Sequence, residues 1–341
     1  MEAEKYLIAY NVKNKEDIEV RKVLSGIKRN LDKKGWGCMI NGCDQKAINS
    51  HLLQRHGVLS NVVENGHCYE LREKDIFSWT KKTPPFEFKR CGIQDAFSLH
   101  LFCNHHDTDV FKPIESGTVD YDNYVNQLLL SYRAICAEIR RKEIIVERYK
   151  RYLGSKILQT YRKDYLCLIE EAIKGNEAGI KDLVFYKHQV EEELASPADN
   201  FFFVHHTYPI KGLYASSSFT ISNYEESIDT SEAVPNCIGH LIPNGECSEF
   251  IFGYQKGHVN DAIVEFVNGW ANLDSESLGE RLTGWFTLIE SWGISPSLFE
   301  RIKPADIDHY FKLFENDFDG ADQTPNIGYN MFAGLLNPTH Q

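Results

Sequence analysis

The sequence predicts an α+β protein with a small N-terminal domain, a helical middle segment and a C-terminal α+β domain that contains an antiparallel sheet. Three observations support this organisation. Cysteine and histidine residues form two tightly spaced pairs within residues 36–115. Apolar residues recur at helical spacing through residues 120–195. Runs of β-branched and aromatic residues, separated by Gly, Pro and Asn, fill residues 200–255.

Length and composition favour two or three domains. The chain has 341 residues, of which 42% are hydrophobic, so each domain can have a core of its own. We place the domain limits at 1–118, 119–196 and 197–341. No run of eighteen apolar residues and no signal-peptide pattern occurs. Nine irregularly spaced cysteines favour a reducing compartment, so we expect a cytoplasmic protein without membrane contact.

A helix is predicted from Asn14, a good N-cap residue, to Gly35. Its buried stripe consists of apolar residues at helical spacing: Ile18, Val23, Leu24, Ile27 and Leu31. Basic residues cover the rest of the helix and are the first candidates for contacts with phosphate groups: Arg21, Lys22, Lys28, Arg29, Lys33 and Lys34.

Two pairs of soft metal ligands follow this helix. Four residues separate Cys38 from Cys43, which is enough chain for a tight turn at Asn41-Gly42 that presents both sulfurs to one ion. Two residues separate Cys103 from His106, a spacing that fits the first turn of a helix. Four such ligands make a closed tetrahedral Zn²⁺ site with a structural role.

Two alternatives compete with this set of ligands. Cys38 and Cys43 could instead bind zinc together with His51 and His56, as in a Cys2His2 finger. Only seven residues lie between Cys43 and His51, where such fingers have about twelve, so there is no room for the small core of a finger. The other alternative is that the thiols bind no metal.

The order of the ligands, with the Ser-His of INSHLL between the two pairs, resembles the treble-clef zinc domain of the HNH (ββα-metal) nuclease superfamily, over residues 36–115 only. In that family a cysteine pair precedes a strand with Asp-His or Glu-His, and a Cys-x-x-Cys-His opens the closing helix. The resemblance places zinc on the two pairs already named. It places the first catalytic position on His51 and the final one on Asp107.

The chain differs from the family pattern at two of these positions. The fourth zinc ligand is His106 rather than Cys, and the final catalytic residue is Asp107 rather than His. Ser98 or His100 lies nearest to the place of the middle Asn.

The resemblance implies a chemistry that suits His51 and Asp107. A histidine base needs a neutral imidazole aimed at a water molecule, beside a divalent ion on the scissile phosphate. The carboxylate of Asp107 suits Mg²⁺ or Mn²⁺, which prefer oxygen ligands. The simpler interpretation is that His51 packs or ligates zinc and that Asp107 only caps a helix.

The middle segment is predicted to be a helical hairpin or a three-helix unit, with a first break at Gly154. We expect a cluster of basic residues on its exposed side, either as a solvated face or as a nucleic-acid stripe: Arg140, Arg141, Lys142, Arg148, Lys150 and Arg151. After the predicted sheet, helices follow from His258 onward. One of them has Ser295 as its cap and Pro296 at its first position.

Charge is divided unevenly along the chain. Residues 1–163 hold 28 Lys and Arg against 21 Asp and Glu, whereas residues 164–341 hold 9 against 28. We therefore expect nucleic acid to contact the basic N-terminal half, and an unidentified ligand or protein to bind the acidic half. The leading hypothesis is a metal-dependent HNH-like endonuclease, by analogy with HNH modules fused to other domains in bacterial defence proteins. The alternative is a non-catalytic, zinc-stabilised protein that binds nucleic acid or acts as a scaffold.

Overall fold

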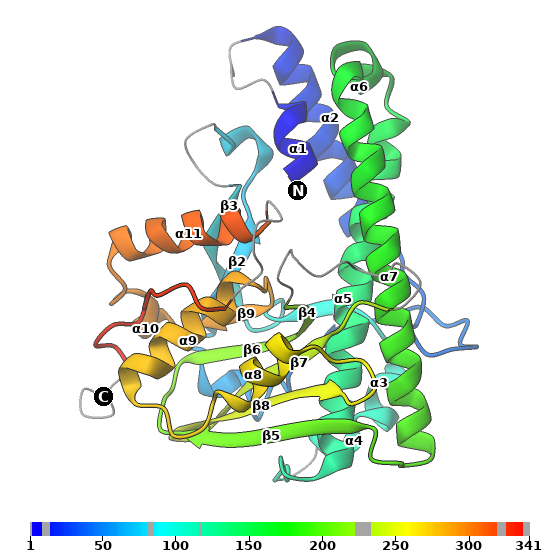
Figure 1. Ribbon diagram of the computed structural model, residues 1–341. Coiled ribbons are helices and arrows are strands. Elements are labelled where there is room, and N and C mark those ends of the chain that lie inside the picture. The colour runs from blue at the N-terminus through cyan, green and yellow to red at the C-terminus, as the bar shows by residue number, and fades with distance from the viewer. Residues whose placement is uncertain are drawn as a thin grey trace.

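The computed structural model describes residues 2–8, 14–80, 85–115, 118–221, 233–318 and 325–336. Within these ranges the chain combines helices with antiparallel strands, which confirms the α+β class (Figure 1). No helix in the described part of the chain is both long and apolar enough to span a bilayer.

A seven-stranded antiparallel sheet forms the centre of the molecule, with the strand order β3-β2-β9-β6-β7-β8-β5. Four strands come from the region where a sheet was predicted: β5 (Phe201–Tyr208), β6 (Leu213–Phe219), β7 (Cys237–Asn244) and β8 (Cys247–Gln255). Three strands come from outside that region: β2 (His67–Glu73), β3 (Phe86–Gly92) and β9 (Trp292–Ile294). The predicted antiparallel sheet is therefore confirmed and is larger than expected.

The sheet joins segments that sequence analysis placed in different domains. Strand β2 pairs with β3 on one side and with β9 on the other, and β9 also pairs with β6. The segment 67–92 was expected to belong to the N-terminal domain, residues 1–118. It extends the C-terminal sheet instead, so the predicted limits at 118 and 196 do not divide the molecule into separate sheets.

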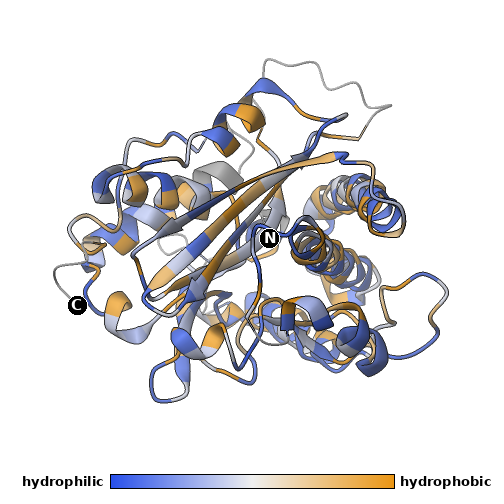
Figure 2. Ribbon diagram, turned by 90° about the horizontal axis from the view of Figure 1, so that it is seen from below, coloured by the Kyte–Doolittle hydropathy of each residue, from blue (hydrophilic) through white to orange (hydrophobic). Residues whose placement is uncertain are grey.

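Helices cover both faces of the sheet (Figure 2). Side chains along β7 point alternately to two hydrophobic cores, one on each face of the sheet. Cys237 and Leu241 face the first core, while Ile238 and Ile242 face the second. The first core also contains residues of three helices: α8 (Asp261–Asn268), α9 (Ser275–Thr287) and α11 (Pro304–Phe318). The short helix α10 (Pro296–Phe299) begins after its cap, Ser295, as predicted.

The second core lies under the predicted helical hairpin, which consists of α5 (Tyr124–Leu153) and α7 (Leu166–Ala195). Helix α5 ends at Gly154, as predicted, and α6 (Lys156–Tyr161) lies in the connection. Helix α7 runs through Gly175 without a break, so the two long helices form the predicted hairpin rather than the three-helix unit.

The N-terminal helices α1 (Glu2–Leu7) and α2 (Lys15–Asp32) pack beside the hairpin (Figure 1). Helix α2 begins after Asn14, whose side chain accepts the N–H of Glu16, so the predicted cap is confirmed. Leu24 and Leu31 of the predicted stripe are buried.

Candidate metal centre

The first pair of cysteines lies in a tight turn after α2. The N–H of Cys38 donates to the carbonyl of Gln45 over 2.9 Å, and the N–H of Cys43 donates to the carbonyl of Ile40 over 3.2 Å. Gly42 between them has a φ of +75°, a conformation that glycine adopts without steric cost. The Asn-Gly step therefore makes the turn that its spacing predicted.

The second pair lies at the start of a short helix, α3 (Asn104–Val110). Cys103 is the N-cap residue of this helix, and His106 lies in its first turn. The helix follows β4 (Ser98–His100), which pairs with β1 (Asn49–His51) in a two-stranded antiparallel sheet. A turn, this small sheet and a helix thus form a compact unit around the four ligands.

The four ligand atoms lie within 4.8 Å of one another: the sulfurs of Cys38, Cys43 and Cys103, and a ring nitrogen of His106. The sulfurs of Cys43 and Cys103 are 3.9 Å apart. His106 Nδ1 is 3.4 Å from the Cys38 sulfur and 3.3 Å from the Cys103 sulfur. Ordinary bond lengths around tetrahedral Zn²⁺ give about 3.8 Å between two sulfurs and about 3.6 Å between sulfur and nitrogen. The group fits zinc in both ligand type and spacing.

The helix start also favours the charged form of one ligand. The backbone N–H of His106 lowers the pKa of the Cys103 thiol, whereas burial raises the pKa of Cys38. Zinc binds thiolates, so the start of α3 supplies a thiol that loses its proton readily.

Both helices of the hairpin hold the first turn in place. Arg140 Nη2 of α5 donates to the carbonyl of Gly37 over 2.7 Å, and its guanidinium lies 4.8 Å from the ring centre of Trp36. Lys187 Nζ of α7 donates to the side chain of Asn41 over 3.2 Å. Arg140 is therefore a buried structural contact rather than part of an exposed basic stripe. Arg148, from the same predicted cluster, is also buried.

His51 lies on β1, beside the ligand group but outside it. Its Nε2 is 3.1 Å from the carbonyl of Ile93. A carbonyl can only accept, so Nε2 carries the proton and Nδ1 keeps a free lone pair. Burial lowers the pKa of His51, which leaves the imidazole neutral near pH 7. The finger alternative is not found, since Cys103 and His106 complete the group instead of His51 and His56.

Asp107 follows the last ligand and lies within electrostatic reach of His51. Burial raises the pKa of Asp107, while Arg133 and the hydroxyl of Ser50 lower it. Its Oδ1 is buried, has no hydrogen-bond partner in the described part of the chain, and lies 3.9 Å from Arg133 Nη2. A buried carboxylate oxygen without a hydrogen-bond partner is suited to bind a cation.

Arg133 and Glu115 are site residues that sequence analysis missed. Arg133 of α5 has a side chain only 1% exposed, and its Nη2 is 2.6 Å from Oε1 of Glu115 in α4 (Lys112–Glu115). Its guanidinium also lies 4.0 Å from the ring centre of Phe111. Arg133 could have been recognised from its place inside the apolar stretch LSYRAIC, because a charged residue on a buried face needs a buried partner.

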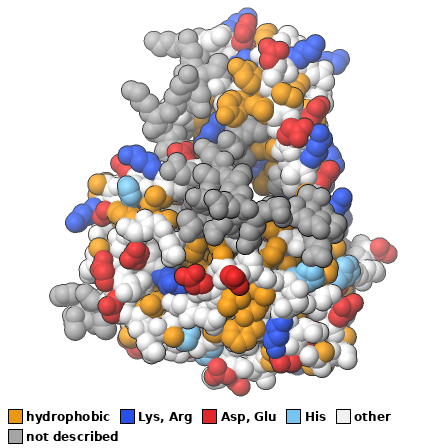
Figure 3. Space-filling view, in the orientation of Figure 1, with side chains coloured by type: hydrophobic (Ala, Val, Ile, Leu, Met, Phe, Trp, Pro, Cys, Tyr) orange, Lys and Arg blue, Asp and Glu red, His pale blue; other side chains and the backbone are white. Residues whose placement is uncertain are grey.

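Three of the six basic residues predicted to contact phosphate are exposed: Lys22, Arg29 and Lys33. Lys28 pairs with Glu73 at 3.0 Å, and Lys34 pairs with Glu147 at 3.1 Å. On the face drawn in Figure 3, Lys and Arg side chains alternate with Asp and Glu over the helical end of the molecule.

Arg21 does not contact phosphate, which corrects the prediction for this residue. Its side chain is fully buried and its Nε is 2.9 Å from Asp17. The guanidinium also donates to the backbone carbonyls of Ile76 and Trp79. Arg21 therefore joins α2 to the segment after β2.

Comparison of the chain with models of known protein families, with curated proteins and with solved structures found no match. The metal centre, with His51 and Asp107 beside it, is the feature from which a function is proposed below.

Proposed function

We propose that the chain is a metal-dependent HNH-like endonuclease whose treble-clef domain is held together by one structural Zn²⁺ ion. The position of two residues that are not ligands carries this proposal. His51 on β1 and Asp107 on α3 both lie next to the ligand group and outside it. The combination of a turn, a two-stranded sheet and a helix resembles the treble clef of HNH nucleases, in which these two positions are catalytic.

The surroundings of His51 suit a general base. The carbonyl of Ile93 holds the Nε2–H, which defines both the tautomer and the direction of the ring. The free Nδ1 can then accept the proton of a water molecule that attacks a phosphodiester. Because burial lowers the pKa of His51, the basic form prevails near neutral pH.

The surroundings of Asp107 suit a divalent ion bound together with substrate. Mg²⁺ sites commonly use one or two carboxylates together with phosphate oxygens and water. Oδ1 of Asp107 is buried without a hydrogen-bond partner among the described residues, so it can contribute one such ligand. A Mg²⁺ or Mn²⁺ ion bound there would stabilise negative charge on the phosphate.

Nucleic acid is the substrate class that this arrangement favours. Arg55 lies within electrostatic reach of His51, and it would place a positive charge beside the scissile phosphate. The proposed further contacts with the backbone of DNA or RNA are the exposed residues Lys22 and Arg29 of α2 and its C-cap residue Lys33.

One observation favours a second function, a zinc-stabilised protein that binds nucleic acid or a partner without cleaving it. Arg133 is a permanent cation 3.9 Å from Oδ1 of Asp107. It supplies positive charge at the position where a divalent ion would otherwise be needed. In addition, Ser98 of β4 lies opposite His51 of β1 in the two-stranded sheet, near the place that the middle Asn occupies in the family.

Nicking of a supercoiled plasmid by the zinc-loaded protein, with Mg²⁺ or Mn²⁺, separates the two functions. We expect His51→Ala and Asp107→Ala each to abolish nicking while the protein keeps its zinc. His309→Ala is the matched control, because His309 is exposed and lies in α11, outside the ligand group. Plasmid binding without cleavage by the unmodified protein would establish the second function instead.

A further inference from the structure

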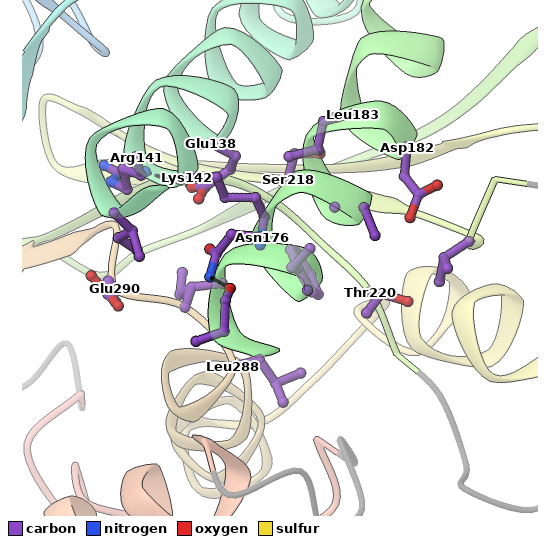
Figure 4. A pocket seen from close by; sticks show the side chains of 18 of the residues that line it. Glu138, Arg141, Lys142, Asn176, Asp182, Leu183, Ser218, Thr220, Leu288 and Glu290 are labelled. Atoms are coloured by element: carbon purple, nitrogen blue, oxygen red, sulfur yellow. Dashed lines mark hydrogen bonds and ion pairs between the residues drawn. The ribbon is translucent and has the colours of Figure 1, made fainter. Parts of the chain in front are cut away.

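A cleft of about 910 Å³ lies between the helical hairpin and the sheet, and no residue of the metal centre lines it (Figure 4). Its walls come from α5 and α7, from β6, and from residues 287–290 at the end of α9. Sites for small molecules commonly have volumes of about 300–1,000 Å³. The cleft is therefore large enough to take a small organic ligand.

Small residues of α7 keep this cleft open: Ala172, Gly175, Ala178 and Gly179. A Cβ added at Gly175 would meet no atom within 4 Å. The side chain of Lys142 lies across Gly179, with Nζ 3.2 Å from the position a Cβ would take. Glycine weakens the interior of a helix. Gly175 and Gly179, about one turn apart in α7, therefore leave space for the cleft at a cost in helix stability.

The charged residues of the cleft fall into two groups. Glu138 is satisfied, because its Oε1 accepts from Arg141 at 2.5 Å and from the hydroxyls of Ser217 and Ser291 at 3.0 Å each. In the described part of the chain, three other lining residues form no ion pair: Lys142, Asp182 and Glu290. Figure 4 shows Glu290 and Asp182 at opposite ends of the cleft, with Lys142 between them.

The two carboxylates are placed where an added cation would stabilise them. Burial raises the pKa of Asp182 and of Glu290, and it outweighs the positive charges of Lys142 and Lys181 near Asp182 and of Arg141 near Glu290. The Asp182 carboxylate also accepts the backbone N–H of Val234. A cation bound in contact with either carboxylate would therefore stabilise its charged form further. Between them the cleft offers apolar side chains, including Leu183 and Leu288, and the polar side chains of Asn176 and Ser218.

We propose that this cleft binds a basic amino acid, either free or within a short basic peptide. The ligand has two cationic groups, which meet Glu290 and Asp182, and a carboxylate, which meets Lys142. Its methylene chain lies on the apolar wall. The charges then balance, because two acids and one base of the protein meet two cations and one anion of the ligand. This inference does not depend on nuclease activity, and it gives the acidic half of the chain a specific ligand class.

Isothermal titration calorimetry on the full-length, zinc-loaded protein tests the proposal. The probes are L-lysine, L-arginine and the dipeptide Lys-Lys, which distinguish free amino acid from peptide. L-norleucine has the same α-amino acid group without the side-chain cation, and L-glutamate has the opposite charge. We expect at least one basic probe to bind at least tenfold more tightly than norleucine or glutamate, since a charge-assisted hydrogen bond in a partly buried site contributes about this factor.

Substitutions in the cleft test which groups are responsible. Glu290→Gln and Asp182→Asn should each weaken binding of the basic probe about tenfold. Glu171→Gln is the matched control, because Glu171 also lines the cleft but is exposed and already pairs with Lys174 at 2.8 Å. Zinc content and melting temperature verify the fold of each variant, and either variant alone is sufficient for the test. Absence of binding by all basic probes, equal binding of norleucine, or unchanged binding by both variants would overturn the proposal.

Discussion

Removal of zinc should unfold the metal-binding turn and α3 while leaving the central sheet in place. The turn has little stability of its own, because none of residues 36–46 is buried. Helix α3 has seven residues and none of them is buried either. Apart from the ligand bonds, the two segments are held only by a few hydrogen bonds, such as those from Arg140 and Lys187, and by partly buried residues at the edge of the second core: Met39, Ile40 and Val110.

The expected magnitude follows from this lack of burial. Binding of structural zinc is worth about 10–16 kcal/mol in small zinc domains, whereas a whole domain is stable by only about 5–15 kcal/mol. Seven-residue helices are also unstable on their own, since nucleation is costly. Loss of the ion should therefore remove the folded state of both segments. In contrast, β6, β7 and β8 lie between two cores and should remain folded.

Hydrogen–deuterium exchange with mass spectrometry, before and after chelation, measures this difference directly. We expect peptides from residues 36–48 and 103–110 to lose protection, and peptides from 237–255 to keep it. Elemental analysis should find one zinc per chain in the protein and none in Cys103→Ser. Cys167→Ser serves as the control, because Cys167 is exposed and is not a ligand. Equal protection of residues 36–48 with and without metal would refute the reasoning.

Three further predictions concern charged groups. Arg133→Met should lower the free energy of unfolding by about 1–3 kcal/mol, because it removes the buried partner of the partly exposed Glu115 carboxylate. An unchanged urea midpoint would contradict this. His240 is fully buried, which lowers its pKa from 6.5 to about 3. The unfolded state therefore binds the proton first, and stability should fall below pH 6.5 by up to about 1.4 kcal/mol per pH unit. A smaller loss of stability at low pH in His240→Gln would identify His240 as the cause, and an identical pH profile would exclude it. Joint replacement of Lys22, Arg29 and Lys33 by Gln should weaken binding to nucleic acid and reduce its salt dependence, by about 0.9 in the logarithmic slope for each lost contact. An unchanged slope would show that these three residues are only solvated.

Features that depend on a few neighbouring residues could be predicted from the sequence. The cap at Asn14, the break at Gly154 and the Ser-Pro start of α10 each rest on the local conformational preference of one or two residues. The metal ligands belong to the same category, since the spacing within each pair determines whether a turn or a helix can present both atoms.

Features that depend on distant partners could not be predicted. Arg148 was expected at the surface, yet it is buried because Glu4 and Glu73 accompany it from other parts of the chain. Nothing in the alternation of β2 shows that its neighbour is β9, more than 200 residues later. For the same reason Arg133, which reaches Asp107 from another helix, was missed.

The position of β9 has a consequence for how the chain is made. This strand lies between β2 and β6, so the sheet cannot be completed until residue 294 has left the ribosome. All four zinc ligands have emerged long before then. The metal-binding unit can therefore fold while β2, which lies between its ligands in the sequence, still lacks β9 as a neighbour. During that interval β2 and β6 each expose an open edge, which is the kind of surface that pairs with other chains. Nascent chains that stall or end before residue 294 should therefore aggregate and depend on chaperones, even when their zinc is in place.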